Sequence, residues 1–264
     1  MARFANAPPL VNRIVRCFLV SLALAVTGCA ATPGRTPLNN DPWEPMNRGI
    51  YRFNDELDRA VVKPVAKGYK AATPEWLRVR VGLFFANVGY PVTMVNQLLQ
   101  GKPKLFAQDT GRFLANTVLG LGGLFDVADR MGMPAHDEDF GQTFAVWGVP
   151  SGPYLMLPVF GPSTLRDAPA RIPSYFLGPY RYTHLSTPIE LGARAAEMID
   201  TRAALLSAES TLESAFDKYG LVRDAWLQRR EYLIFDGDPP VEPLLLEDDL
   251  PEDSDSQSAA PGGN

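Results

Sequence analysis

Only a few side chains of this 264-residue chain are of types that carry out chemistry. The two histidines, His136 and His184, are the only imidazole bases available for general acid–base catalysis. His136 opens the acidic run HDED, where a solvated loop, or at most a weak cation site through Asp137 and Asp139, is favoured over catalysis. His184 stands among aromatic residues, which indicates a turn or packing position. Neither histidine marks an active site.

The motifs that usually accompany catalysis are absent from the sequence. There is no G-x-S-x-G nucleophile elbow, no phosphate-binding G-x-x-x-x-G-K-[ST] and no zinc-binding H-E-x-x-H. The run GLGG (120–123) lacks the third glycine of a dinucleotide-binding loop and follows no convincing strand. We therefore expect no enzyme activity, no cofactor and no resident metal.

A cysteine near the N-terminus carries a different kind of chemistry. Three arginines and about ten apolar residues lead to the run VTGC, which ends at Cys29. Such a leader is a secretory signal, too short for the roughly twenty apolar residues of a transmembrane helix. Its end resembles a bacterial lipobox and predicts cleavage before an acylated Cys29; the alternative is a plain signal that ends by chance in Gly-Cys. Ala30 follows the cysteine, which favours sorting to the outer membrane.

Asn54 lies on the apolar stripe of the first expected helix, four residues after Ile50 and three before Leu57. A buried amide costs free energy unless it finds hydrogen-bond partners. The pattern favours a satisfied core asparagine. The alternative is a helix face that borders something partly polar, such as a path for a lipid headgroup.

Two glycines, Gly148 and Gly152, lie four residues apart beside Pro150. Glycines at this spacing form either a simple loop or the hinge of a moving segment. The pattern by itself favours the simple loop.

Helix-start signals and hydrophobic periodicity predict a mainly α fold in one domain, with one irregular segment rich in proline and glycine. Three runs, DPWE, TPEW and TPIE, combine a capping residue, a proline and a glutamate. We expect helices over 41–62 (ended by Lys63-Pro64), 74–88 (ended by Gly89-Tyr90-Pro91), 91–100, 103–120 (ended by GLGG), a short stretch within 124–150, 187–207, and one pattern reaching from 212 to 235. Within 149–167, YLML is strand-like and the rest reads as turn and kinked coil.

Charge and composition restrict the partners. Residues 1–28 hold three arginines and no acid, and residues 236–264 hold nine acids and no base, which leaves 22 basic and 21 acidic residues in 29–235. Because residues 29–235 carry almost no net charge, nucleic acid is disfavoured as a partner, and contact with lipid is favoured. After the signal is removed, no apolar run reaches spanning length, and Cys29 has no partner for a disulfide because Cys17 is lost with the signal. The acidic tail is disordered by composition, and we expect it to be dispensable for folding.

Five runs of sequence, in order, resemble the MlaA/VacJ lipoprotein family of Gram-negative outer membranes. They are DPWEPMNRGIYRFND, VNQLLQGKP, FLANTVLGLGGLFDVA, FGQTFAVWGVPSGPYLMLPVFGPSTLRD and VRDAWLQRR. The resemblance covers roughly 41–235 and divides the chain into a signal peptide (1–28), a lipidated tether (29–40), a helical domain (41–235) and an acidic tail (236–264).

The resemblance implies a ring of helices, embedded in the inner leaflet of the outer membrane, around a polar channel. Proteins of this family remove misplaced phospholipids from the outer leaflet, hand them to a soluble periplasmic carrier (MlaC-like) and sit beside trimeric porins. Phe53 and Asn54 match first-helix positions that control the state of the channel in the family. Gly148 and Gly152 fall in its glycine-containing segment, which is proposed to be flexible.

Two other functions compete with lipid transport. A structural lipoprotein that scaffolds porins or envelope assembly needs no channel and can remain soluble on its anchor. A phospholipase is disfavoured because the nucleophile motif is missing.

Overall fold

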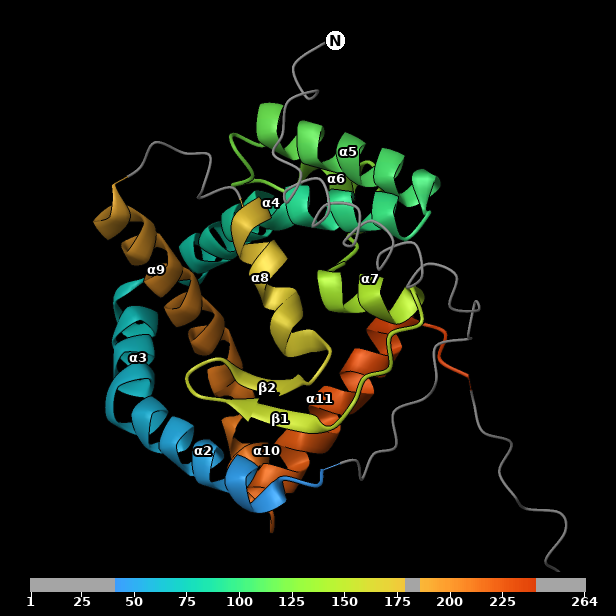
Figure 1. The fold of residues 1–264 in the computed structure, drawn as a ribbon. Coiled ribbons are helices and arrows are strands. Elements are labelled where there is room, and N and C mark those ends of the chain that lie inside the picture. The colour runs from blue at the N-terminus through green and yellow to red at the C-terminus, as the bar shows by residue number, and fades with distance from the viewer. Residues whose placement is uncertain (1–40, 179–185, 241–264) are drawn as a thin grey trace, which may run out of the picture.

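The computed structural model describes residues 41–178 and 186–240. This part of the chain is mainly helical, as expected, with one small antiparallel sheet. Figure 1 shows α2, α3, α4, α7 and α11 arranged around the β1–β2 hairpin and α8. The elements are α2 (Glu44–Leu57), the π-helical η1 (Asp58–Val62), α3 (Lys63–Ala72), α4 (Glu75–Leu99), α5 (Pro103–Val118), α6 (Val127–Arg130), α7 (Phe140–Val146), β1 (Tyr154–Leu157), β2 (Gly161–Thr164), α8 (Asp167–Leu177), α9 (Thr187–Leu205), the 3₁₀ turn η3 (Leu206–Ala208), α10 (Glu209–Ser214) and α11 (Lys218–Ile234).

The prediction that Lys63-Pro64 ends the first helix is wrong. The chain continues from α2 through η1 into α3, so one long arm runs to Ala72. In the π turn, the N–H of Lys63 bonds to the carbonyl of Asp58, five residues back. This wider turn takes up the distortion that a proline without an N–H causes in a helix.

The predicted break at Gly89-Tyr90-Pro91 is also absent. α4 is a single helix of 25 residues with Pro91 inside it. A proline removes one backbone hydrogen bond and crowds the preceding turn, and packing can offset that cost. Here α4 packs along α5, and Tyr90 and Thr93 on either side of the proline are buried.

All three predicted start signals lie at helix starts, but none caps as expected. α2 begins after Trp43 and α4 after Pro74, each without a side-chain cap, and α9 begins after Ser186. Asp41 is buried instead and accepts hydrogen bonds from Asn47 and Tyr219. The proline and glutamate therefore mark the helix starts correctly. Asp41, which was expected to cap the first helix, makes tertiary hydrogen bonds instead.

The remaining expectations are mixed. The helix over 103–120 ends at GLGG as predicted, with left-handed backbone at Gly122 and Gly123, and YLML is the strand β1. The coil expected after YLML contains the second strand, β2, and the helix α8 follows it. The single pattern over 212–235 divides into α10 and α11 around the fully exposed Phe216.

Candidate functional site

The distribution of polar and apolar residues is the reverse of that in an ordinary soluble protein. Among the described residues, eighteen polar or charged residues are buried but only eleven hydrophobic ones, of which five are alanine. Thirty-four large hydrophobic residues are exposed, including Trp43, Trp76 and Phe84. Exposure of so many large apolar side chains is typical of proteins that contact a membrane or a partner. Over the described part of the chain, no helix is both long and apolar enough to cross a bilayer.

The small apolar core lies beneath the hairpin. Tyr154 and Met156 of β1 pack with Tyr219 and Leu227 of α11. Tyr154 and Tyr219 meet edge to face with ring centroids 6.2 Å apart, a favoured aromatic geometry. The core therefore fixes the base of the hairpin to α11, and most other buried contacts are polar.

Asn47 of α2 holds the base of the hairpin. β2 pairs with one edge of β1, and the other edge faces α2 and has no strand partner within residues 41–178 and 186–240. The amide of Asn47 donates to the carbonyl of Tyr154 (3.1 Å) and accepts from the N–H of Met156 (2.9 Å). It also donates to Asp41 (2.8 Å) and is fully buried. One side chain thus supplies the backbone bonds that a neighbouring strand would have made.

Asn54 repeats this arrangement at the tip of the hairpin. Its amide donates to the carbonyl of Leu157 (2.9 Å) and accepts from the N–H of Val159 (2.7 Å). The expectation of a satisfied amide is confirmed, although the side chain is only partly buried and its partners are backbone groups of the hairpin turn. The neighbouring Phe53 is 55% exposed and makes no core contact.

The spacing of the two asparagines matches that of the hairpin groups they bind. Asn47 and Asn54 are seven residues apart, which in an α-helix places them on one face about 10.5 Å apart. The carbonyls they bind belong to Tyr154 and Leu157 at the two ends of β1, three residues apart, or roughly 10 Å of extended chain. Asn54 was expected from the sequence and Asn47 was not, although a second asparagine two helical turns away was the available signal.

Charged residues fix the other side of the hairpin base. Asp167 is the first residue of α8, three residues after the end of β2, and accepts from Arg230 of α11 (2.9 Å) and from Arg166 (2.8 Å). Arg230 also binds the carboxylate of Asp139 at 2.6 and 2.7 Å. Although burial opposes both shifts, this pairing raises the pKa of Arg230 and lowers the pKa of Asp139. Position 141, beside this ion pair, requires glycine, because a Cβ there would lie 2.2 Å from the guanidinium of Arg230.

The HDED loop is solvated only in part, because Asp137 is exposed whereas Glu138 is buried. His136 lies 3.1 Å from the buried carboxylate of Asp109, and Glu138 accepts from Lys102 (2.9 Å). Burial raises the pKa of Asp137 and of Glu138 above their ordinary values. His136, Glu138 and Asp139 each have a side-chain partner, and that of Asp139 is Arg230. Over the described residues, no group of three or more histidine, cysteine or acidic side chains is placed to hold a metal ion.

The two glycines of the candidate hinge both have left-handed backbone. Gly148 (φ 84°) ends α7, and its N–H bonds to the carbonyl of Ala145. Gly152 (φ 66°) approaches Leu165 so closely that a Cβ would lie 3.0 Å from that of leucine. Close by, the N–H of Arg166 bonds to the carbonyl of Ser151. The hinge remains a prediction. In this structure Gly152 packs against Leu165, the residue that directly follows β2.

Three expectations fall wholly or largely outside the described residues. Cys29, His184 and most of the acidic tail are not among them. The first residue of that tail, Asp236, is described and forms an ion pair with Lys102 (2.5 Å). The body therefore holds at least the beginning of the segment that was expected to be independent of it.

A polar interior, an apolar exterior and a hairpin held by two asparagines are the features to compare with known proteins. The sequence model of the MlaA lipoprotein family matches residues 39–233. The chain belongs to the MlaA lipoprotein family. An Escherichia coli relative, named intermembrane phospholipid transport system lipoprotein MlaA, is 36% identical over 250 residues, which cover 90% of this chain and 98% of that one.

Further relatives and one solved structure are similar over most of the chain. The protein of the same name from Haemophilus influenzae is 30% identical, over 88% of this chain and 95% of its own. An uncharacterized protein of Rickettsia felis is 39% identical, over 72% of this chain and 76% of its own. A solved structure described as "Structural basis for maintenance of bacterial outer membrane lipid asymmetry" superposes with a TM-score of 0.64 at 34% identity, covering 74% of this chain and 98% of that one.

Proposed function

We propose that this protein removes misplaced phospholipids from the outer leaflet of a Gram-negative outer membrane and passes them to a soluble periplasmic carrier. Relatives similar over most of their length are named lipoproteins of an intermembrane phospholipid transport system. The lipid anchor is Cys29, and the helical body lies in the inner leaflet beside trimeric porins. No chemical step is needed for this role.

The observation that carries the proposal is the inverted distribution of polar and apolar residues. Removing acyl chains from lipid costs about 0.8 kcal/mol for each CH₂, and a charged headgroup is strongly excluded from hydrocarbon. A body with a polar interior and exposed Trp, Phe, Leu and Val side chains meets both requirements. Its exterior remains in the leaflet while headgroups follow a polar path through its middle.

The tip of the hairpin is the part that moves in our proposal. The base is fixed by the buried Asn47 and by the Asp167–Arg230 pair, whereas the tip is held by Asn54 alone among the side-chain hydrogen bonds described for residues 158–160. Val159 and Phe160 at the tip are 57% and 69% exposed. Asn54 therefore acts as the latch, with Phe53 exposed beside it, and the bonds near Gly152 favour motion at the tip over motion of the whole segment.

Movement through such a path has no internal energy source. The sequence contains no nucleotide-binding motif. Direction comes from the excess of phospholipid in the outer leaflet and from capture by the carrier, because a passive path only equalises the free energies on its two sides.

Transfer in a purified system separates lipid transport from scaffolding. The acylated protein is reconstituted into vesicles that contain a fluorescent phospholipid, and the soluble periplasmic carrier is added outside. We expect labelled lipid to appear on the carrier at a rate that depends on the amount of protein. A folded, membrane-inserted protein that gives no transfer would support the scaffold instead.

Embedding is tested separately with Cys29→Ala, which lacks the anchor. We expect this variant to partition into detergent because of its exposed apolar side chains. Ready solubility in plain buffer would contradict the embedded body.

A further inference from the structure

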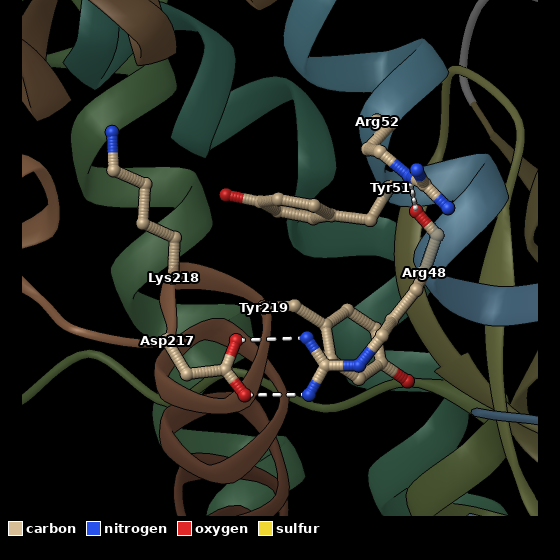
Figure 2. A pocket seen from close by; sticks show the side chains of 6 residues that line it. All are labelled: Arg48, Tyr51, Arg52, Asp217, Lys218 and Tyr219. Carbon is tan, nitrogen blue, oxygen red and sulfur yellow. Dashed lines mark hydrogen bonds and ion pairs between the residues drawn. The ribbon is translucent and has the colours of Figure 1, made fainter. Parts of the chain in front are cut away.

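The buried arginines of this protein are matched by acids. Among the described residues the buried arginines are Arg112, Arg166 and Arg230, and each forms an ion pair. A partly exposed arginine does the same: Figure 2 shows Asp217 accepting two hydrogen bonds from the guanidinium of Arg48, at 2.9 and 2.5 Å. This acid raises the pKa of Arg48. Pairing is therefore how the body accommodates a guanidinium.

Arg171 of α8 has no such partner. Within residues 41–178 and 186–240 it forms no ion pair, and its contacts are a hydrogen bond to the carbonyl of Pro162 (3.3 Å) and the ring of Phe160, 5.8 Å from the guanidinium. A guanidinium has five N–H donors, so most of them are unused here. The side chain is exposed, and a ligand can therefore reach it.

The position of Arg171 relates it to the polar interior. Figure 1 shows α8 inside the ring that α2, α3, α4, α7 and α11 form. The groups that act on the guanidinium belong to this interior: the ring of Phe160 at the hairpin tip, Asp139 at the start of α7, and Arg230 of α11. Arg171 thus lies beside the part of the hairpin that moves in the proposed function.

The surroundings of Arg171 carry more positive than negative charge. Desolvation by the surrounding protein lowers the pKa of Arg171, although Asp139 and Asp167 act in the opposite direction. Both acids are already bound by Arg230, at 2.6 and 2.9 Å, and Asp167 also by Arg166. Three guanidinium groups therefore face two carboxylates, which leaves a net charge of about +1. An anion that enters here compensates a cation that the protein itself leaves unmatched.

We propose that Arg171 binds the phosphate of a phospholipid headgroup in the polar interior and favours headgroups with a net negative charge. This inference rests on the proposed transport function and names a residue that selects its substrate. Arginine binds phosphate through two charge-assisted hydrogen bonds. In phosphatidylglycerol the phosphate charge is uncompensated, whereas phosphatidylethanolamine carries an ammonium group that the positive surroundings repel. Movement of the tip takes Phe160 away from the guanidinium, so the ligand is uncovered as the path opens.

Selectivity is tested by competition between two lipids. Vesicles contain the acylated full-length protein with equal amounts of phosphatidylglycerol and phosphatidylethanolamine, and mass spectrometry measures both lipids on the added carrier. The preference of the carrier is common to all variants, so their ratios can be compared directly. We expect Arg171→Gln to lower the ratio of phosphatidylglycerol to phosphatidylethanolamine about tenfold, and Arg171→Lys, which keeps the charge, to lower it about twofold.

Arg52→Gln is the matched control, and we expect it to leave the ratio unchanged. Arg52 is an exposed arginine of α2 whose one side-chain hydrogen bond, at 3.4 Å, runs to the carbonyl of Arg48 in its own helix. Unfolding midpoints of all three variants in detergent establish that a changed ratio does not reflect a loss of fold.

A binding measurement makes the test independent of transport. Dihexanoyl phosphatidylglycerol, its ethanolamine counterpart and inorganic phosphate are each titrated calorimetrically into the acylated protein, in an uncharged and phosphate-free detergent. We expect the affinity for the short-chain phosphatidylglycerol to fall about tenfold in Arg171→Gln and to be unchanged in Arg52→Gln. We expect inorganic phosphate to bind more weakly than this lipid, because it lacks the acyl chains and the rest of the headgroup.

The two measurements separate a failure of this inference from a failure of the transport function. Equal lipid ratios and equal affinities in the wild type and Arg171→Gln would overturn the role of Arg171 while transport stands. If no protein transfers lipid but the affinity falls only in Arg171→Gln, transport is refuted and the headgroup site is supported. Inorganic phosphate that binds as tightly as the short-chain lipid would indicate a general anion site and overturn the assignment to a headgroup.

Discussion

Asn47 and Asn54 make nearly the same contacts in different surroundings. Each lies on α2 and uses its amide to bond one carbonyl and one N–H of the hairpin. Asn47 is fully buried beside the aromatic core, and Asn54 is only partly buried. A hydrogen bond broken in a dry site leaves groups that water cannot reach, whereas one broken at a surface is replaced by water. In our proposal the same type of side chain therefore holds the base permanently and releases the tip.

Backbone conformation separates the two ends of the hairpin further. Val159, whose N–H Asn54 holds, has φ 68°, in the left-handed region that a β-branched residue rarely adopts. Such a conformation costs about 1–3 kcal/mol and persists only where the surroundings impose it. The strain at the tip favours release, and nothing similar occurs among the residues of β1 at the base.

The largest effect is expected from Arg230→Met, which breaks the charged side of the base. Asp139 and Asp167 would lose their main partner in a buried site, and breaking such a pair costs about 3–5 kcal/mol. We expect the free energy of unfolding in detergent to fall by that amount. Arg229→Met, at the exposed neighbouring position, is the control and should change stability little. Equal effects of the two variants would contradict a fixed base.

Asn47→Leu should rank next. It leaves the carbonyl of Tyr154 and the N–H of Met156 without partners, at about 1–3 kcal/mol for each unsatisfied buried group. We expect a loss of about 3 kcal/mol in denaturant unfolding, with the hairpin amides exchanging faster with solvent. If Asn47→Leu proves no more harmful than Asn54→Leu, burial does not distinguish the two asparagines.

Asn54→Leu should lower the free energy of unfolding by about 1 kcal/mol, because water can replace the lost bonds. Its functional effect should be larger than its effect on stability, since both the latch and its polar group are gone. We expect more phospholipid in the outer leaflet of cells that express it than in cells with an equal amount of the wild-type protein. A wild-type level of exposed phospholipid would mean that this face of α2 is ordinary core.

Val159→Gly is the smallest change and acts in the opposite direction. Glycine adopts left-handed backbone without a steric cost, so the substitution relieves the strain at this position. The greater freedom of glycine in the unfolded chain offsets only part of this gain. We expect the protein to become more stable by about 0.5–1 kcal/mol, and the tip to open less often. Faster hydrogen exchange at the tip of this variant would show that the backbone there is not strained.

Local rules located the helices but not how the arm and the hairpin are assembled. Proline and glutamate marked three helix starts correctly, yet Asp41 was expected to cap and instead binds Asn47 and Tyr219. Pro64 and Pro91 were expected to end helices, because their cost is visible in sequence while the π turn and the packing that offset it are not. Tertiary partners outweighed the local signal in each case.

The candidate site was predictable only in part for the same reason. Periodicity placed Asn54 on an apolar stripe, but Met46, Phe53 and Val61 of that stripe are exposed rather than packed in a core. Periodicity identifies an apolar face and does not say whether protein or lipid covers it. The HDED loop likewise reads as solvated, because its partners Asp109, Lys102 and Arg230 are distant in sequence.

The central claim, that lipid passes only when the hairpin tip moves, is tested most directly by tethering the tip while leaving Asn54 intact. Phe160 lies against Arg171 of α8, with the guanidinium 5.8 Å from the ring. In the double variant Phe160→Cys, Arg171→Cys, a short bifunctional thiol reagent joins the tip to α8, and the proposed acylation of Cys29 leaves no competing thiol there. The measurement is transfer of fluorescent phospholipid from vesicles to the carrier, for linked and unlinked samples of the same protein and for each single-cysteine variant treated with the reagent. We predict that the linked protein transfers no lipid above background while the unlinked one remains active; transfer at the unlinked rate after complete linkage would contradict the account.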